Sequence, residues 1–152
     1  QSIPGDSVDA VLATGVTSPA DLDRRIQAVQ AFRRLPEAAA LAAANKRIRN
    51  ILKKSGFDPA GQAVNPALLA EPAEQSLSAR IAEAAKTVAP LQAAQDYTGV
   101  LMALAQLRPE VDAFFDAGMV MAEDEALRRN RLVLLGSLEA LFLSVADISV
   151  LQ

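Results

Sequence analysis

The chain has 152 residues, of which 51% are hydrophobic but only 4% aromatic, and its formal net charge is −3. It contains no cysteine and no histidine, which excludes disulfides, thiolate or imidazole metal sites and catalysis by a histidine general base. No apolar run reaches the ~20 residues that a membrane span needs, and the N-terminus lacks a signal-peptide pattern. We therefore expect a cytoplasmic protein without membrane contact. The absence of an initiating Met favours an excised domain or a processed product.

The composition predicts an all-α domain, folded as a helical bundle. Only six residues are aromatic, so the core must be built from alanine, leucine, valine and isoleucine. Alanine is the best helix former, and small side chains let helices approach closely. The charge is also polarised, because residues 1–54 hold nine Lys and Arg against five Asp and Glu, whereas residues 55–152 hold six against thirteen. An anionic partner is therefore expected on the first third of the chain.

We expect residues 1–17 to form a linker and a short helix that stops at Gly15, and residues 18–152 to form the helical domain. Ser18 and Pro19 are a typical helix start, with a capping hydroxyl followed by proline at the first helical position. This helix should run to about residue 34. A third helix is predicted from about residue 36 to residue 54, ended by Gly56 in the left-handed conformation.

The middle of the chain begins with a loop over residues 57–65, which are rich in turn formers, and a short turn over residues 66–69. A long helix should start at Pro72. Pro90 lies deep in its pattern and is expected to kink the helix or split it near residue 89. The apolar residues at helical spacing predict this buried side: Leu77, Ile81, Ala84, Ala85 and Val88.

Three helices are predicted in the rest of the chain. They cover about residues 97–107, residues 109–117 up to Gly118, and residues 124–145. The last has a leucine stripe typical of a core-facing helix. Gly136 inside it costs roughly 1 kcal/mol relative to alanine, so we expect a close helix crossing there. The members of the stripe are Leu127, Leu134, Leu138, Leu141 and Val145, widened by Leu135 and Phe142.

The strongest local signal is the basic segment 44–54, whose apolar face centres on Ile48 while cations and amides take the opposite face. Lysine and arginine bind phosphates, and an amide such as that of Asn45 or Asn50 can read a base edge. The alternative is a solvated helix face whose cations favour the negative end of the helix dipole. The predicted contacts to an RNA are Lys46, Arg49, Asn50 and Lys53, with Arg33, Arg34, Arg47 and Lys54 as phosphate neighbours.

Two further candidates lie outside this helix. Phe57, in the predicted loop, is the best aromatic side chain for stacking on a base, and its alternative is a hydrophobic contact that caps the preceding helix. Arg129 should project outward from the last helix. The alternative for Arg128, Arg129 and Arg131 is ion pairing with Glu123, Asp124 or Asp116. No catalytic arrangement and no glycine-rich phosphate loop occurs.

Four strings in the same order carry a family resemblance. They occupy residues 42–54, residues 111–125, residues 127–135 and the end of the chain from residue 145. The third string begins within the Ala-Leu-Arg of residues 126–128, and these residues directly follow an acidic turn. Together they resemble the C-terminal, DALR-type anticodon-binding domain of bacterial glycyl-tRNA synthetase β subunits. The resemblance implies an all-helical domain that binds the anticodon region of glycine tRNA.

The resemblance also implies partners that this chain lacks. In such an α₂β₂ enzyme the α subunit holds the ATP and glycine site, so the partners expected here are glycine tRNA, the remainder of the β subunit and the α subunit. This domain is expected to be non-catalytic and to hold no cofactor, since ATP and Mg²⁺ are used by the whole enzyme. Two alternatives are a helical protein-interaction module and the anticodon-binding domain of an arginyl-tRNA synthetase. The sequence at the end of the chain argues against the second of these.

Overall fold

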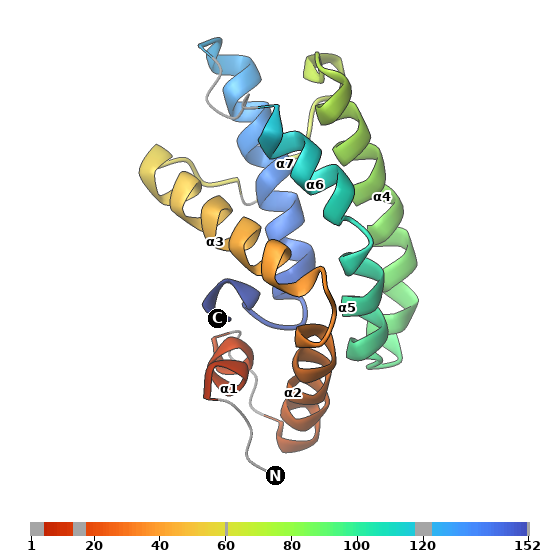
Figure 1. The fold of residues 1–152 in the computed structure, drawn as a ribbon. Helices are drawn as coiled ribbons and strands as arrows, with labels where there is room; N and C mark the ends of the chain where they lie inside the picture. Colours follow the sequence, from red (N-terminus) through yellow and green to blue (C-terminus); the bar gives the residue numbers. More distant parts are fainter. Residues whose placement is uncertain (1–4, 14–17, 60, 118–122, 152) are drawn as a thin grey trace.

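The computed structural model describes residues 5–13, 18–59, 61–117 and 123–151, which fold as a bundle of α-helices without a β-strand (Figure 1). The predicted all-α fold is therefore confirmed. The elements in chain order are α1 (Gly5–Leu12), α2 (Pro19–Arg33), α3 (Ala38–Ser55), the 3₁₀ turn η1 (Pro66–Leu68), α4 (Pro72–Ala93), α5 (Tyr97–Ala105), α6 (Arg108–Asp116), α7 (Glu125–Leu143) and the 3₁₀ turn η2 (Ile148–Val150).

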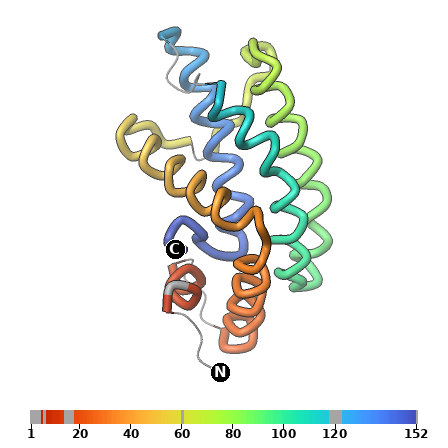
Figure 2. The backbone as a smooth tube through the Cα atoms, in the orientation of Figure 1, coloured from red at the N-terminus to blue at the C-terminus, as the bar shows by residue number. Residues whose placement is uncertain are grey.

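The last helix, α7, forms the centre of the bundle. It contacts α3 on one side and α4 on the other, and Figure 2 shows its path between them. Its leucine stripe enters the core as predicted, since Leu134, Leu135 and Leu138 are at most 1% exposed. Phe142 continues the stripe and packs edge-on against Phe32 of α2, with ring centroids 6.2 Å apart. α7 thus supplies a core surface that α2, α3, α4 and α5 share.

The first helix, α1, belongs to the same core as the rest of the chain. Its Ala10 and Val11 are fully buried, and α1 packs against both α2 and η2. The backbone N–H of Asp147 donates to the carbonyl of Ala10 at 2.7 Å. The predicted boundary between residues 17 and 18 therefore separates two segments that share one hydrophobic core.

The helix ends follow the local signals in the sequence. The Ser18 hydroxyl accepts from the backbone N–H of Asp21, and Gly56 adopts a left-handed φ of 66° after α3. The carboxylate of Asp124 accepts from the backbone N–H of Leu127 and caps α7. These contacts satisfy backbone groups that a helix terminus leaves unpaired. The other two predicted end signals, Gly15 and Gly118, lie outside the described residues.

Pro90 does not split its helix, so of the two expected outcomes, a kink or a split, the split is wrong. α4 continues through Pro90 to Ala93 and is closed by Gln95, whose φ is 59°. A proline removes one hydrogen bond to the carbonyl four residues earlier, here that of the exposed Lys86. The helix tolerates this because only one further turn follows and solvent can reach that carbonyl. The predicted burial of Ala85 is also wrong, since it is exposed, whereas Leu77, Ile81, Ala84 and Val88 are buried.

A polar cluster on Tyr97 joins α5 to α2. The Tyr97 hydroxyl donates to Oδ1 of Asp21 at 2.5 Å, and Arg25 Nε donates to Oδ2 at 2.8 Å. The hydrogen bond from Tyr97 lowers the pKa of the Asp21 carboxyl, while burial raises the pKa of the Tyr97 hydroxyl. The Arg25 guanidinium also lies 4.3 Å from the centre of the Tyr97 ring. These contacts fix α2 beside α5.

Gly136 marks a close approach to a loop, not the helix crossing that was predicted. A Cβ built on Gly136 would lie 2.5 Å from Cγ and 2.8 Å from Cβ of Pro59, which belongs to the segment between α3 and η1. Because Gly136 has no side chain, α7 leaves room at this position for the Pro59 ring. This notch holds the loop against the central helix.

We expect Gly136→Ala to lower the free energy of unfolding by about 1–2 kcal/mol, because overpacking against Pro59 outweighs the gain in helix propensity. In a Pro59→Gly background the obstructing ring is gone. There the same Gly136→Ala change should raise stability by up to about 1 kcal/mol. Urea denaturation of wild type, the two single variants and the double variant measures both effects. If Gly136→Ala changes the free energy of unfolding with the same sign in both backgrounds, the notch is contradicted.

Candidate nucleic-acid interface

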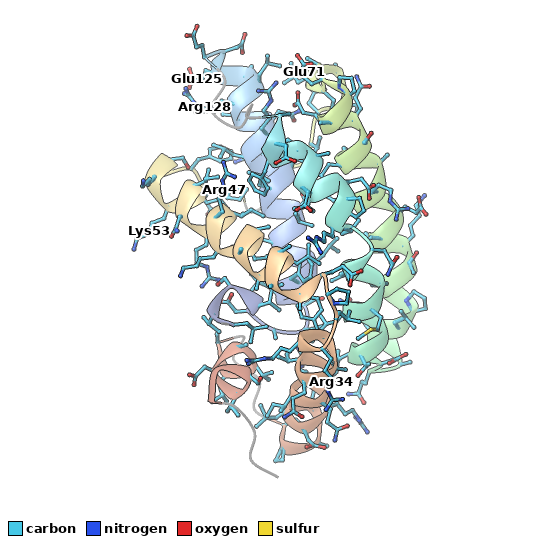
Figure 3. The ribbon with its side chains drawn as sticks, viewed as in Figure 1. Arg34, Arg47, Lys53, Glu71, Glu125 and Arg128 are labelled. Atoms are coloured by element: carbon cyan, nitrogen blue, oxygen red, sulfur yellow. The ribbon has the colours of Figure 1, made fainter. Side chains whose placement is uncertain are left out.

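The basic helix α3 has one face in the core and the other in solvent. Leu41 and Ile48 are at most 1% exposed, whereas Lys46, Asn50 and Lys53 are exposed on the opposite side. We call these three exposed residues the α3 ridge. Among the described residues, no ion pair or side-chain hydrogen bond engages them. Figure 3 shows the Lys53 side chain directed away from the bundle.

Arg49 borders the ridge but is held by two carboxylates. Its Nη1 lies 2.5 Å from Oδ2 of Asp147, and its Nε lies 3.7 Å from Oε2 of Glu139. Asp147 is buried, so Arg49 neutralises a charge that would otherwise be costly. Burial raises the pKa of the Glu139 carboxyl, and Arg49 opposes that rise. Arg49 remains a predicted RNA contact, and the structure also makes it a link between α3 and the end of the chain.

The other flank of α3 carries Arg47 and Lys54, both exposed. The Arg47 guanidinium lies 4.5 Å from the centre of the Phe115 ring on α6, a cation–π contact; Figure 3 labels Arg47. Stacking holds the planar group without an ion pair, so its outer edge still carries donors toward solvent. Lys54 lies in the last turn of α3, where the helix dipole also favours a cation.

Asn45 is not available to read a base, contrary to expectation. Its side chain is buried, and Nδ2 donates to the backbone carbonyl of Leu41 at 2.9 Å. Asn45 and Asn50 are five residues apart, which turns them well away from each other on a helix of 3.6 residues per turn. Only Asn50 presents its amide to solvent.

Phe57 and Arg129 come together from separate parts of the chain. The Arg129 guanidinium lies 5.7 Å from the centre of the half-buried Phe57 ring. Arg129 also pairs with Glu125 one turn earlier on α7, at 3.6 Å. Arg129 is therefore ion-paired, but with Glu125 in place of the predicted Glu123, Asp124 or Asp116. The two predicted contacts form one aromatic and cationic corner beyond the end of α3.

An asparagine clamp, missed by sequence reasoning, holds the loop that follows Phe57. Oδ1 of Asn130 accepts from the backbone N–H of Asn65 at 2.7 Å, and its Nδ2 donates to the Asn65 carbonyl at 3.1 Å. Asn130 is 5% exposed, and its amide satisfies both backbone groups of one loop residue. Together with the notch at Gly136, this clamp fastens the loop to α7. A lone asparagine between arginines carries no sequence signal for such a contact.

The remaining predicted contacts, Arg33 and Arg34, lie at the end of α2. Arg34 is exposed (Figure 3), whereas Arg33 is half-buried and its Nη1 donates to the Ser7 hydroxyl at 3.1 Å. Beside Arg33 is a hollow of about 430 Å³ that sequence reasoning missed. Its lining residues are Arg33, Ala38, Ala39, Ala42, Ala43, Lys46 and Leu151.

The described residues bring together no group of three or more metal-ligating side chains. In the same part of the chain, none of the helices combines the length and apolar character needed to cross a membrane. What the structure does present is a helical bundle with an exposed cationic helix face and an aromatic side chain beyond its end. This combination defines a helical domain suited to binding a phosphate backbone and unstacked bases.

The chain belongs to the DALR anticodon binding domain family, which it matches over residues 41–148. This range runs from the end of the first turn of α3 to the start of η2, so it includes the α3 ridge and the central helix.

Comparison with curated relatives shows which enzymes contain a segment similar to this chain. The chain is 53% identical to the glycine–tRNA ligase beta subunit of Marinobacter nauticus, 55% to that of Shewanella amazonensis and 51% to that of Pseudoalteromonas translucida. The matches cover 99–100% of this chain but 22% of each relative. The chain thus spans about a fifth of the length of these relatives, and the resemblance seen in its sequence motifs is confirmed.

Proposed function

We propose that this chain is the anticodon-binding domain of a glycine–tRNA ligase β subunit and binds the anticodon arm of glycine tRNA through the α3 ridge. The observation that carries the proposal is the exposure of Lys46, Asn50 and Lys53 on one helix face, inside the region that matches an anticodon-binding family. The relatives named above, all glycine–tRNA ligase beta subunits, supply the identity of the tRNA.

The α3 ridge offers two kinds of contact to an RNA, one to phosphates and one to a base edge. Lys46 and Lys53 provide mobile ammonium groups for phosphates, which set position without reading sequence. Asn50, between them, offers an amide with paired donor and acceptor to a base edge. Arg47 and Lys54 extend the positive field along one flank of the ridge, and Arg34, at the end of α2, is proposed as a further phosphate neighbour. Because attraction of phosphates depends on local charge, the net charge of −3 does not oppose RNA binding.

The corner at the end of α3 supplies a second kind of contact. The Phe57 ring offers a face on which an unstacked loop base can stack, and Arg129 beside it offers donors for a phosphate. The clamp at Asn130 and the notch at Gly136 keep the following loop in place. Phe57 is thereby held near the ridge, and one RNA loop can reach both.

The complete enzyme is the setting for this domain. We propose that it works with the remainder of the β subunit and with the α subunit of a cytoplasmic heterotetramer, where ATP and Mg²⁺ are used. The α subunit would carry the aminoacylation site, and this domain would help the enzyme to select its tRNA. The protein-interaction and arginyl-enzyme alternatives are less favoured, because the relatives that cover the whole chain are glycine enzymes.

A titration of a fluorescent glycine-tRNA anticodon stem-loop with this chain tests the proposal. We expect saturable binding, and a logarithmic affinity that falls with logarithmic salt at a slope near −3 to −4, as about four to five phosphate contacts require. A stem-loop with a swapped anticodon should bind more weakly. Equal affinity for both RNAs, or displacement by an acidic peptide as readily as by RNA, would favour a general interaction module instead.

A further inference from the structure

The hollow beside α3 is continuous with the α3 ridge. Ala39 and Ala43 are exposed, as are Lys46, Asn50 and Lys53. Their spacing of four, three, four and three residues places all five along one face of the helix. The first part of this face therefore presents only methyl groups, and the second part presents cations and an amide. A ligand that follows the ridge toward the start of α3 reaches the hollow.

The hollow has the size and the lining of a binding site for a small group. Its volume is about 430 Å³, within the ~300–1,000 Å³ typical of ligand pockets. Ala38 and Ala42, each 7% exposed, form part of its floor, and the half-buried Leu151 forms a wall. Among the described residues that line it, the charged ones, Arg33 and Lys46, are both cations, and none carries a carboxylate.

We propose that this hollow receives one unstacked base of the anticodon loop, with the phosphate of that nucleotide on Lys46. An apolar floor and wall suit the faces of a base, which proteins that extrude nucleotides hold between aromatic or apolar side chains. The cationic rim suits the phosphate. The inference rests on the proposed function and adds a base-binding subsite to it.

The alanines are what keep the hollow open. A larger side chain at position 39 or 43 would occupy the space without entering the helical core, because both alanines are exposed. Leucine has a helix propensity close to that of alanine. The substitutions Ala39→Leu and Ala43→Leu therefore fill the hollow and leave α3 intact, and a thermal melt followed by circular dichroism checks this for each variant.

The experiment compares the binding of anticodon stem-loops to wild type, Ala43→Leu and Ala39→Leu. Ala82→Leu, on the exposed side of α4, is the matched control. A set of stem-loops carries one abasic nucleotide at each loop position in turn. We expect both filling variants to bind the intact stem-loop about tenfold more weakly, the usual range for loss of one base contact. Ala82→Leu should bind as wild type does. The salt dependence of the affinity should be the same in all the variants as in wild type.

The abasic set identifies the contact. One abasic stem-loop should bind wild type more weakly, and it should bind wild type and the filling variants equally, because the base that enters the hollow is already missing. Affinities that are unchanged in both filling variants, or reduced by the same factor for every abasic RNA, would overturn the subsite and leave the proposed function standing. An absence of stem-loop binding by wild type would overturn the proposed function and the subsite with it.

Discussion

Replacing Arg131 by Met while Glu74 stays in place is expected to lower the free energy of unfolding by about 3–5 kcal/mol. Arg131 Nη2 lies 2.8 Å from Oε1 of Glu74, and the two side chains are 5% and 0% exposed. Among the described residues, the Glu74 carboxylate otherwise accepts only from the backbone N–H of Glu71, at 3.2 Å. Removing the cation therefore leaves a buried negative charge with little compensation. Chemical denaturation at neutral pH measures the loss.

Two controls separate this effect from the loss of packing. Arg129→Met breaks the exposed pair with Glu125, whose side chains are 63% and 69% exposed, and should cost less than about 1 kcal/mol. The double variant Glu74→Leu/Arg131→Met removes both buried charges and should recover most of the stability. If Arg131→Met costs no more than Arg129→Met, the buried pair between Arg131 on α7 and Glu74 on α4 does not stabilise the fold.

This pair fixes one end of the bundle. Figure 3 shows Glu71 and Glu125 where α4 and α7 begin, at the same end of the molecule. Glu74 accepts from the backbone of Glu71 and so also takes part in the capping box of α4. One carboxylate thereby sets the start of α4 and the position of that helix against α7. The other end is held separately, by Tyr97 and Arg25.

The local features of this fold were predictable from sequence because each depends on neighbouring residues. The cap at Ser18, the left-handed Gly56 and the leucine stripe of α7 all follow from backbone hydrogen bonding and helical periodicity. The exposure of the α3 ridge follows from the same periodicity, since a buried Ile48 turns Lys46 and Lys53 outward. Helix boundaries were accordingly correct to within a few residues.

The features that failed depend on partners far away in the chain. Arg131 was expected to pair with nearby acids, but its partner is 57 residues away on α4. Gly136 was assigned to a helix crossing, whereas it accommodates a loop proline. Periodicity shows which way a residue points from its own helix and does not show what lies there. A tertiary structure is needed for such contacts.

The same limit applies to the candidate site. Sequence reasoning grouped Arg49 with the ridge, and only the packing of η2 against α3 reveals that Asp147 holds it. The hollow also depends on a wall supplied by Leu151, more than a hundred residues after Ala38. A run of alanines in the sequence indicates a helix. The space that these small side chains leave beside the helix becomes a binding site only where other elements enclose it.

Charge reversal of the ridge lysines should have the largest effect on RNA affinity. A unit charge 4 Å from a phosphate in water contributes about 1 kcal/mol, so reversal changes the interaction by about 2 kcal/mol, or roughly 30-fold for each lysine. Lys46→Glu and Lys53→Glu should each reduce the magnitude of the salt slope by about one. Stem-loop titrations at several salt concentrations measure both quantities.

The matched control for these reversals is Lys86→Glu on the exposed side of α4. It changes the net charge of the chain by the same amount but lies outside α3, so affinity and salt slope should stay near those of wild type. Asn50→Asp, between the two lysines, adds one negative charge and removes the amide donors that a base edge requires. It should therefore reduce discrimination between the native and the swapped anticodon as well as affinity. Equal losses for Lys86→Glu and the ridge variants would mean that net charge, and not the α3 ridge, determines RNA binding.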